Sequence, residues 1–182
     1  MLKKSLLFSL SLFLFGCATD STSSFRVDNS RAGLARQILE NPAKYKFASY
    51  HLSGVKDQAT ALINMQATAA GYSARRSSYA KAPGGSCYLQ ENMLRGMISL
   101  GREYSISISE VAGGGHSATS RHYLGVAYDV THINGVKVSW SNPYYRAYMS
   151  KARALGATEV LGPGDRNHNG HLHIAWPRPA GQ

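Results

Sequence analysis

The chain has 182 residues, of which 43% are hydrophobic and 16% are charged, and it carries a net charge of +10. This composition excludes an intrinsically disordered protein, and the length suits one compact domain rather than two. A basic surface attracts polyanions such as nucleic acids, wall polymers or lipid headgroups. Because Arg75-Arg76 is the only adjacent basic pair after residue 4, the sequence has no dense run of Lys and Arg, and we expect no nucleic-acid partner.

Residues 1–16 have the pattern of a secretory signal peptide. Lys3 and Lys4 precede an apolar stretch of 11 residues at 5–15, which is too short for a membrane-spanning helix of about 20 residues. An ordinary signal peptide with a chance cysteine at position 17 is one interpretation.

The favoured interpretation is a lipid anchor, because Gly16-Cys17 after the apolar stretch resembles a bacterial lipobox, with Phe15 as its one departure. The resemblance implies acylation of Cys17, and Ala18 in the next position favours the outer membrane, with the protein facing the periplasm. The small polar residues of the segment 17–24 then form a lipidated tether. The other cysteine, Cys87, is left without an internal disulfide partner, and we expect it to be a small buried hydrophobic residue.

Helical periodicity and end signals predict three helices in the remainder of the chain, at residues 29–40, 88–100 and 143–155. Gly101 is expected to cap the end of the second helix, and Ser141 or Asn142 the start of the third. The segment 43–86 has no clear pattern.

Alternating or short apolar runs predict five strands, at residues 104–111, 126–133, 136–140, 159–161 and 171–176. Asn134-Gly135 between the second and third of these is the strongest short signal for a β-hairpin. Because hairpin-connected strands are mixed with helices, we expect an α+β domain with a mostly antiparallel sheet flanked by helices.

Histidines are concentrated late in the chain, with six of the seven between His116 and His173. Residues two apart in a strand share a face, so His171 and His173 should project together. His122 precedes the strand of Asp129 by a short turn and can fold back toward it. Two imidazoles and one carboxylate, with a fourth position open to water, are the ligands of a catalytic zinc site.

These residues belong to two motifs, S-x-H-x-x-G-x-A-x-D at 120–129 and H-x-H at 171–173. The pair resembles the superfamily of zinc D-Ala-D-Ala carboxypeptidases, murein endopeptidases and hedgehog signalling domains, over residues 88–177. The resemblance implies a hedgehog/DD-peptidase-like fold with His122, Asp129 and His173 as zinc ligands. It also implies that His171 lies beside the metal, where it handles protons or stabilises the oxyanion.

Two features depart from the carboxypeptidase pattern. Many members carry a general-base Glu just before the last histidine, whereas this chain has no Glu there. It has His168 five residues before His173, in an H-x-x-H-x-H spacing that resembles the murein endopeptidase branch. His168 is therefore a second catalytic candidate, with a polar loop as the alternative. The S-G-x-R motif, which in many relatives places an arginine near the substrate, is also missing. Ser120 is expected to support the site or the substrate by hydrogen bonding. His51, His116 and His132 are expected to be structural, with a place in the wall of the cleft as the alternative for His116.

The sequence thus predicts a zinc metallopeptidase, of DD-carboxypeptidase or endopeptidase type, that hydrolyses peptide bonds of peptidoglycan through a metal-activated water. The predicted domains are an extension of unknown role at 25–87, packed on a zinc peptidase core at 88–182. Peptidoglycan and a membrane reached through the lipid anchor are the expected partners of a monomeric chain. The alternative is a zinc-containing lipoprotein module that binds the wall or a partner without catalysis.

Overall fold

The computed structural model describes residues 28–178 and residue 180. The predicted signal peptide, the lipidation site Cys17 and the tether at 17–24 lie outside the described residues. Among the described residues, none of the helices combines the length and the apolar character needed to cross a membrane.

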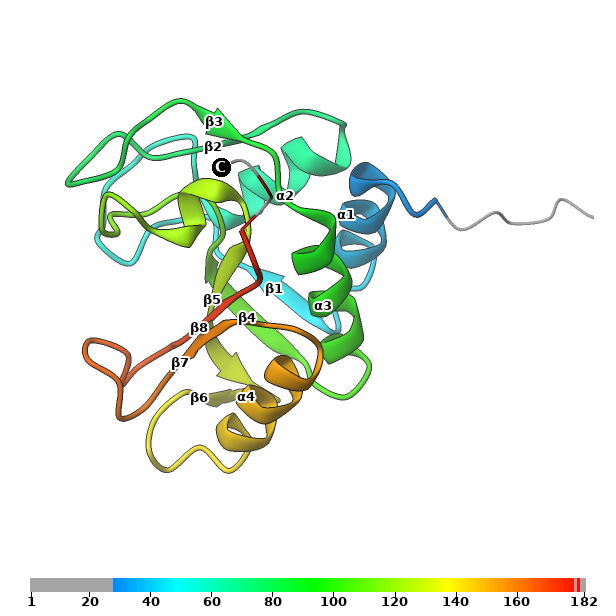
Figure 1. Ribbon diagram of the computed structural model, residues 1–182, viewed down its shortest axis with the longest axis vertical. Helices are drawn as coiled ribbons and strands as arrows, with labels where there is room; N and C mark the ends of the chain where they lie inside the picture. Colours follow the sequence, from blue (N-terminus) through cyan, green and yellow to red (C-terminus); the bar gives the residue numbers. More distant parts are fainter. Residues whose placement is uncertain (1–27, 179, 181–182) are drawn as a thin grey trace, which may run out of the picture.

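A six-stranded mixed sheet organises the domain (Figure 1). Five strands follow one another in the order β1-β4-β5-β8-β7, and β6 pairs with the far end of β5. Only β1 and β4 run parallel; the other pairs are antiparallel, which confirms the α+β class. The strands are β1 (Tyr45–Phe47), β4 (Ile106–Glu110), β5 (Ala127–Ile133), β6 (Val136–Lys137), β7 (Glu159–Leu161) and β8 (Leu172–Ala175). The pair β2 (Ala74–Arg75) and β3 (Ser86–Cys87) forms a separate antiparallel ribbon.

Four α-helices and one 3-10 turn complete the described fold. They are α1 (Arg31–Leu39), α2 (Ala61–Ala69), α3 (Glu91–Gly101), η1 (Arg121–Leu124) and α4 (Tyr145–Ala154). All three predicted helices are present, and α2 falls in the segment that has no sequence pattern. Ser30 and Thr60 cap α1 and α2, because their hydroxyls accept hydrogen bonds from the backbone N–H groups three residues later.

Side chains from α1, α3, α4 and one face of the sheet form a continuous core. Met93, Met97 and Leu100 of α3 are fully buried there, as the 3.6-residue spacing predicts. The expectation that Gly101 caps α3 is wrong, because Gly101 is the last residue of the helix itself. A Cβ at this position would lie 1.8 Å from Oη of Tyr45, so the glycine is needed for close packing.

The β5–β6 hairpin turns at Asn134-Gly135, whose φ angles of 50° and 78° are those of a type I′ turn. β6 ends at Lys137, three residues before the predicted end of this strand. Asn142 explains where the chain goes next. Its side-chain amide donates to the carbonyls of Val136 and Lys137, and its oxygen accepts from the backbone N–H groups of Tyr144 and Tyr145. The expectation that Ser141 or Asn142 caps α4 is wrong, because Tyr144 occupies the N-cap position.

Residues 28–87 share the core of the rest of the chain. β1 extends the sheet beside β4, and α1 packs against both α2 and α3. Cys87, in β3, is a free thiol that is only partly buried. The segment therefore supplies an edge strand and two helices to the described domain.

Candidate metal centre

Three side chains converge where β5 and β8 lie side by side. Nε2 of His122 is 3.1 Å from Oδ1 of Asp129 and 3.1 Å from Nδ1 of His173, and that Nδ1 is 3.0 Å from the same Oδ1. Asp129 and His173 are direct register partners across the two strands, and η1 brings in His122. All three side chains are buried. The structure thus brings the three predicted ligands together.

The hydrogen bonding around His122 leaves an electron pair on the nitrogen that faces this cluster. Its Nδ1 is 2.6 Å from the carbonyl oxygen of Val111 and donates its proton there. Nε2 then directs its lone pair at a carboxylate and a second imidazole. The electron pairs of these groups repel one another unless a proton or a cation lies between them.

The pKa shifts agree with a site that attracts positive charge. Burial alone would lower the pKa of His122, but the charge of Asp129 outweighs it and raises that pKa. Burial would likewise raise the pKa of Asp129, yet His122 and His173 hold it well below its usual range. The carboxylate is therefore ionised at neutral pH and is available as a ligand.

The spacing of the three atoms also suits a small divalent cation. Ligand atoms about 2.0–2.1 Å from zinc at tetrahedral angles lie about 3.3 Å apart. The distances of 3.0–3.1 Å found here differ from that value by a few tenths of an ångström. Two imidazoles and one carboxylate form a donor set that binds zinc and other divalent transition metals.

His116 is a fourth residue of the centre. Its expected structural role does not account for its place beside His122 and Asp129. Its ring stacks on that of His122, with the centroids 4.0 Å apart and the planes 10° apart. His116, His122 and Asp129 each offer a ligand atom within 4.8 Å of the others, so this group can hold a metal ion. Burial lowers the pKa of His116 to about 3, which keeps its imidazole neutral and able to coordinate.

His168 and His171 lie beside the centre, on its more accessible side. Nε2 of His171 is 3.9 Å from Oδ2 of Asp129, and 27% of its side chain is exposed. Burial lowers the pKa of His171, so it is neutral at pH 7. The ring of His168 lies 4.9 Å from that of His171, between centroids, and its Nδ1 is held 2.7 Å from the carbonyl oxygen of Arg166.

The remaining fixed positions of the first motif shape the turn that carries His122. The Ser120 hydroxyl accepts a hydrogen bond from the backbone N–H of His122 and caps η1. Gly125 ends η1 with a φ of 69°, and a Cβ there would lie 2.3 Å from the carbonyl oxygen of Tyr88. Ser120 therefore positions His122, and only glycine fits at the end of the turn.

Glu159, which no sequence motif indicates, lies behind His173 on β7. Its Oε1 is 3.1 Å from Nε2 of His173, and its Oε2 is 3.0 Å from Nε of Arg121. Nε2 of His173 is buried and has no aligned hydrogen-bond partner among the described residues, so a small rotation of Glu159 would complete this contact. A carboxylate behind a ligating histidine fixes the ring and increases its basicity.

A second buried array borders the centre at the end of β4. His51 is 2% exposed, and its Nδ1 lies 2.8 Å and 3.0 Å from the two carboxylate oxygens of Glu110. Its Nε2 is 2.7 Å from Oδ1 of Asp57. Glu110 is the register partner of Asp129, and burial raises the pKa of its carboxyl to about 7. His51 thus links two carboxyl groups.

Comparison with protein-family models, with curated proteins and with solved structures finds no match to this chain. The resemblance to zinc peptidases therefore depends on the two motifs and on the geometry of the residues in them.

Proposed function

We propose that this chain is a zinc-dependent peptidase that hydrolyses peptide bonds of peptidoglycan. The observation that carries the proposal is the convergence of Nε2 of His122, Oδ1 of Asp129 and Nδ1 of His173 within 3.1 Å of one another in a buried site. In a site of this kind, zinc lowers the pKa of a bound water to about 7 and polarises a carbonyl group.

The protein's own groups supply the rest of the chemistry. His122, Asp129 and His173 hold the metal, and Glu159 holds His173 in orientation. His171 is neutral and partly exposed beside Asp129, so it can accept a proton and pass it to the leaving amine. His168, next to His171, is in a position to assist that transfer.

The substrate class follows from the predicted route of the protein. A signal peptide and a lipidated Cys17 would place a basic monomer at the outer membrane, facing the periplasm and the wall. Peptidoglycan stem peptides and crosslinks are the amide bonds available there. Both cleavage of a crosslink and removal of a terminal residue are compatible with the site.

The test is digestion of purified peptidoglycan by the protein, with the fragments identified by mass spectrometry in the presence and absence of a chelator. We expect new fragments that depend on zinc and that disappear in Asp129→Ala. His171→Ala should keep its zinc while its activity falls by about 10²–10⁴-fold, the usual contribution of a general acid or base. His132→Ala, which alters a histidine of the same strand as Asp129, is the matched control.

The competing function is a zinc-containing module that binds the wall or a partner without turnover. Zinc bound in stoichiometric amount, with no cleavage of any stem or crosslink, would establish that function instead. Absence of zinc from the wild-type protein would refute both.

A further inference from the structure

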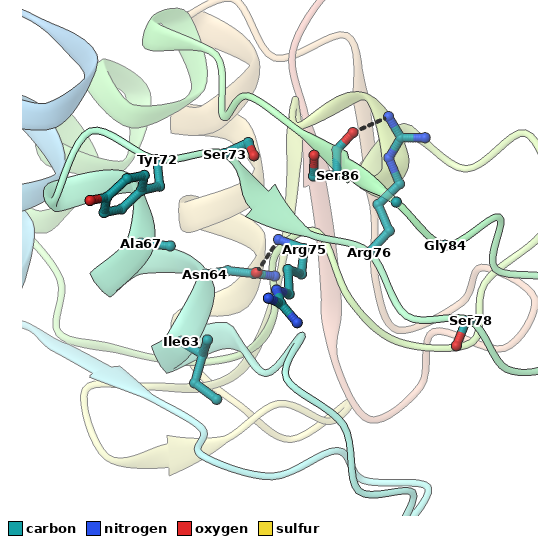
Figure 2. Close-up of a pocket in the computed structure, with 11 residues that line it drawn as sticks. Ile63, Asn64, Ala67, Tyr72, Ser73, Arg75, Arg76, Ser78, Gly84 and Ser86 are labelled. Carbon is teal, nitrogen blue, oxygen red and sulfur yellow. Dashed lines mark hydrogen bonds between the residues drawn. The ribbon is translucent and has the colours of Figure 1, made fainter.

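Two cavities flank the β2–β3 ribbon, apart from the residues of the metal centre. The larger, of about 710 Å³, is drawn in Figure 2 and lies between the ribbon and α2. The second, of about 620 Å³, lies between the ribbon, the start of α3 and η1. Arg76 and Ser86 line both, so we treat the two cavities as one groove and name it the arginine groove.

The charge of the arginine groove is entirely positive. Arg75 and Arg76 line the first cavity, Arg31 and Arg76 line the second, and neither lining contains an aspartate or glutamate. None of the three arginines forms an ion pair with any residue that the structure describes. By contrast, Arg36, Arg95 and Arg121 each pair with a carboxylate.

The guanidinium groups of Arg31 and Arg76 are each held by a hydrogen bond and keep further N–H donors that no described residue uses. Arg76 donates from Nη2 to the carbonyl oxygen of Ser86 at 2.6 Å, and its Nε is buried without a hydrogen-bond partner among the described residues. Arg31 donates from Nε to the carbonyl oxygen of Leu89 at 2.6 Å and stacks on the ring of Tyr88, 4.6 Å from its centroid. A buried N–H donor without an acceptor is costly unless a ligand or water meets it.

The arginines point in different directions. In Figure 2 the side chain of Arg75, the last residue of β2, extends toward Ile63, whereas that of Arg76 extends toward Ser86. A compact phosphate group requires donors that converge on one point. Separate guanidinium groups instead suit an extended ligand that carries several separate carboxylates.

The arginine groove ends close to the metal centre. Tyr123 lines it, and the hydroxyl of Tyr123 donates to the carbonyl of Gly114 and accepts from the backbone N–H of His116. On the same side, Sγ of Cys87 is 4.0 Å from the carbonyl oxygen of His122. Two residues that line the groove, Cys87 and Tyr123, therefore contact the backbone of His122 and His116 of the candidate metal centre.

We propose that the arginine groove binds an acidic peptide, with Arg31, Arg75 and Arg76 each receiving a separate carboxylate of the ligand. This inference rests on the proposed function for its choice of ligand, which is the carboxylate-bearing stem peptide of peptidoglycan. The groove holds the stem peptide on one side of the metal centre while another part of the substrate lies at the metal.

The experiment measures binding of soluble stem peptides to the full chain by titration calorimetry, with a chelator present so that the peptides stay intact. One set of peptides keeps its carboxyl groups free, and a second set has them converted to amides. The variants are Arg75→Gln and Arg76→Gln. Arg146→Gln, on an exposed position of α4 at the opposite end of the molecule from the ribbon (Figure 1), is the matched control.

We expect each groove variant to bind the free-carboxyl peptides about tenfold more weakly, as loss of one charge-assisted hydrogen bond predicts. The wild type and both groove variants should bind the amidated peptides equally weakly. Arg146→Gln should bind both sets of peptides as the wild type does. Arg75 keeps the test valid even if Arg76→Gln disturbs the ribbon, because the Arg75 guanidinium makes no hydrogen bond to the described part of the chain.

Equal binding of free and amidated peptides, or wild-type binding by both variants, would overturn the inference. Polyphosphate that binds more tightly than the peptides, with the same loss in Arg75→Gln, would also overturn it in favour of a phosphate polymer. Carboxylate-dependent binding without any zinc-dependent cleavage would support the groove and refute only the peptidase. Cleavage with unchanged binding in the variants would refute only the groove.

Discussion

Glu159→Gln tests whether the carboxylate behind His173 supports a metal site. The substitution keeps the size and shape of the side chain but removes its charge. Oε1 of Glu159 lies 3.1 Å from Nε2 of His173, which is the nitrogen opposite the one that faces the metal centre. The Glu159 carboxylate orients the His173 ring and increases the ability of Nδ1 to donate its lone pair to a metal. Loss of the charge removes both effects.

The magnitude follows from the exposure of the two partners. Loss of such a supporting group costs about 10–100-fold in metal affinity, or about 1.4–2.7 kcal/mol. The His173 side chain is 8% exposed, but that of Glu159 is 38% exposed, so water can replace part of the lost contact. We therefore expect a loss near the lower limit, about tenfold. The ion pair with Arg121 is lost as well, which weakens the link between β7 and η1.

The assay is competition for zinc between the protein and a chromogenic chelator of known affinity. Glu103→Gln is the control, because Glu103 forms an exposed ion pair with Lys151 on another part of the surface. An affinity of Glu159→Gln within twofold of wild type would show that this carboxylate does not support a ligand. An equal loss of zinc affinity in Glu103→Gln would show that the effect comes from the change in net charge.

Three further predictions concern stability. His51→Ala removes the buried imidazole that lies between Glu110 and the partly exposed Asp57, and should lower the free energy of unfolding by about 3 kcal/mol in denaturant titrations. Gly96→Ala places a Cβ 1.9 Å from Cζ2 of Trp176, so denaturant titration should show a loss of about 1–3 kcal/mol from overpacking. The pKa of His116 is about 3 in the folded protein and about 6.5 when unfolded, so the unfolded state binds the proton first as the pH falls. With a chelator present, stability should decline progressively below pH 6.5, and His116→Gln should show a shallower decline.

Matched variants make these stability measurements decisive. His132→Ala removes a partly exposed histidine from β5 and should change the free energy of unfolding far less than His51→Ala. Gly170→Ala adds a methyl group where no atom lies within 4 Å, so a loss equal to that of Gly96→Ala would contradict the packing argument. An identical acid dependence in wild type and His116→Gln would show that His116 does not resist protonation.

The local features of the fold could be predicted because they are encoded in short stretches of sequence. Asn134-Gly135 has the two residue types that tolerate positive φ, and the predicted turn is found there. The spacing of methionine and leucine on α3 matches its buried face. Asp129 and His173 could be placed together because each stands on a predicted strand and the two motifs that contain them supply the donor set of a metal site.

The missing parts depend on contacts between distant residues. α2 has no strong amphipathic pattern, because it packs against α1 and the β2 ribbon rather than against one broad apolar face. Glu159 and His116 lie 14 and 57 positions before His173 in the chain, and only the sheet and the glycine-rich loop bring them to the centre. No local pattern indicates which glutamate lies behind a histidine.

The position of β8 couples folding to assembly of the site. This strand comes last in chain order, yet it occupies an interior place between β5 and β7. The sheet therefore cannot close during synthesis until residue 175 is available, and the same insertion delivers His173 to Asp129. Long-range pairing of this kind is slow compared with helix formation, so an emerging chain remains open while it awaits its final strand. A chain that stops before β8 would lack both this interior strand and His173, so unfinished copies would have no assembled candidate metal centre.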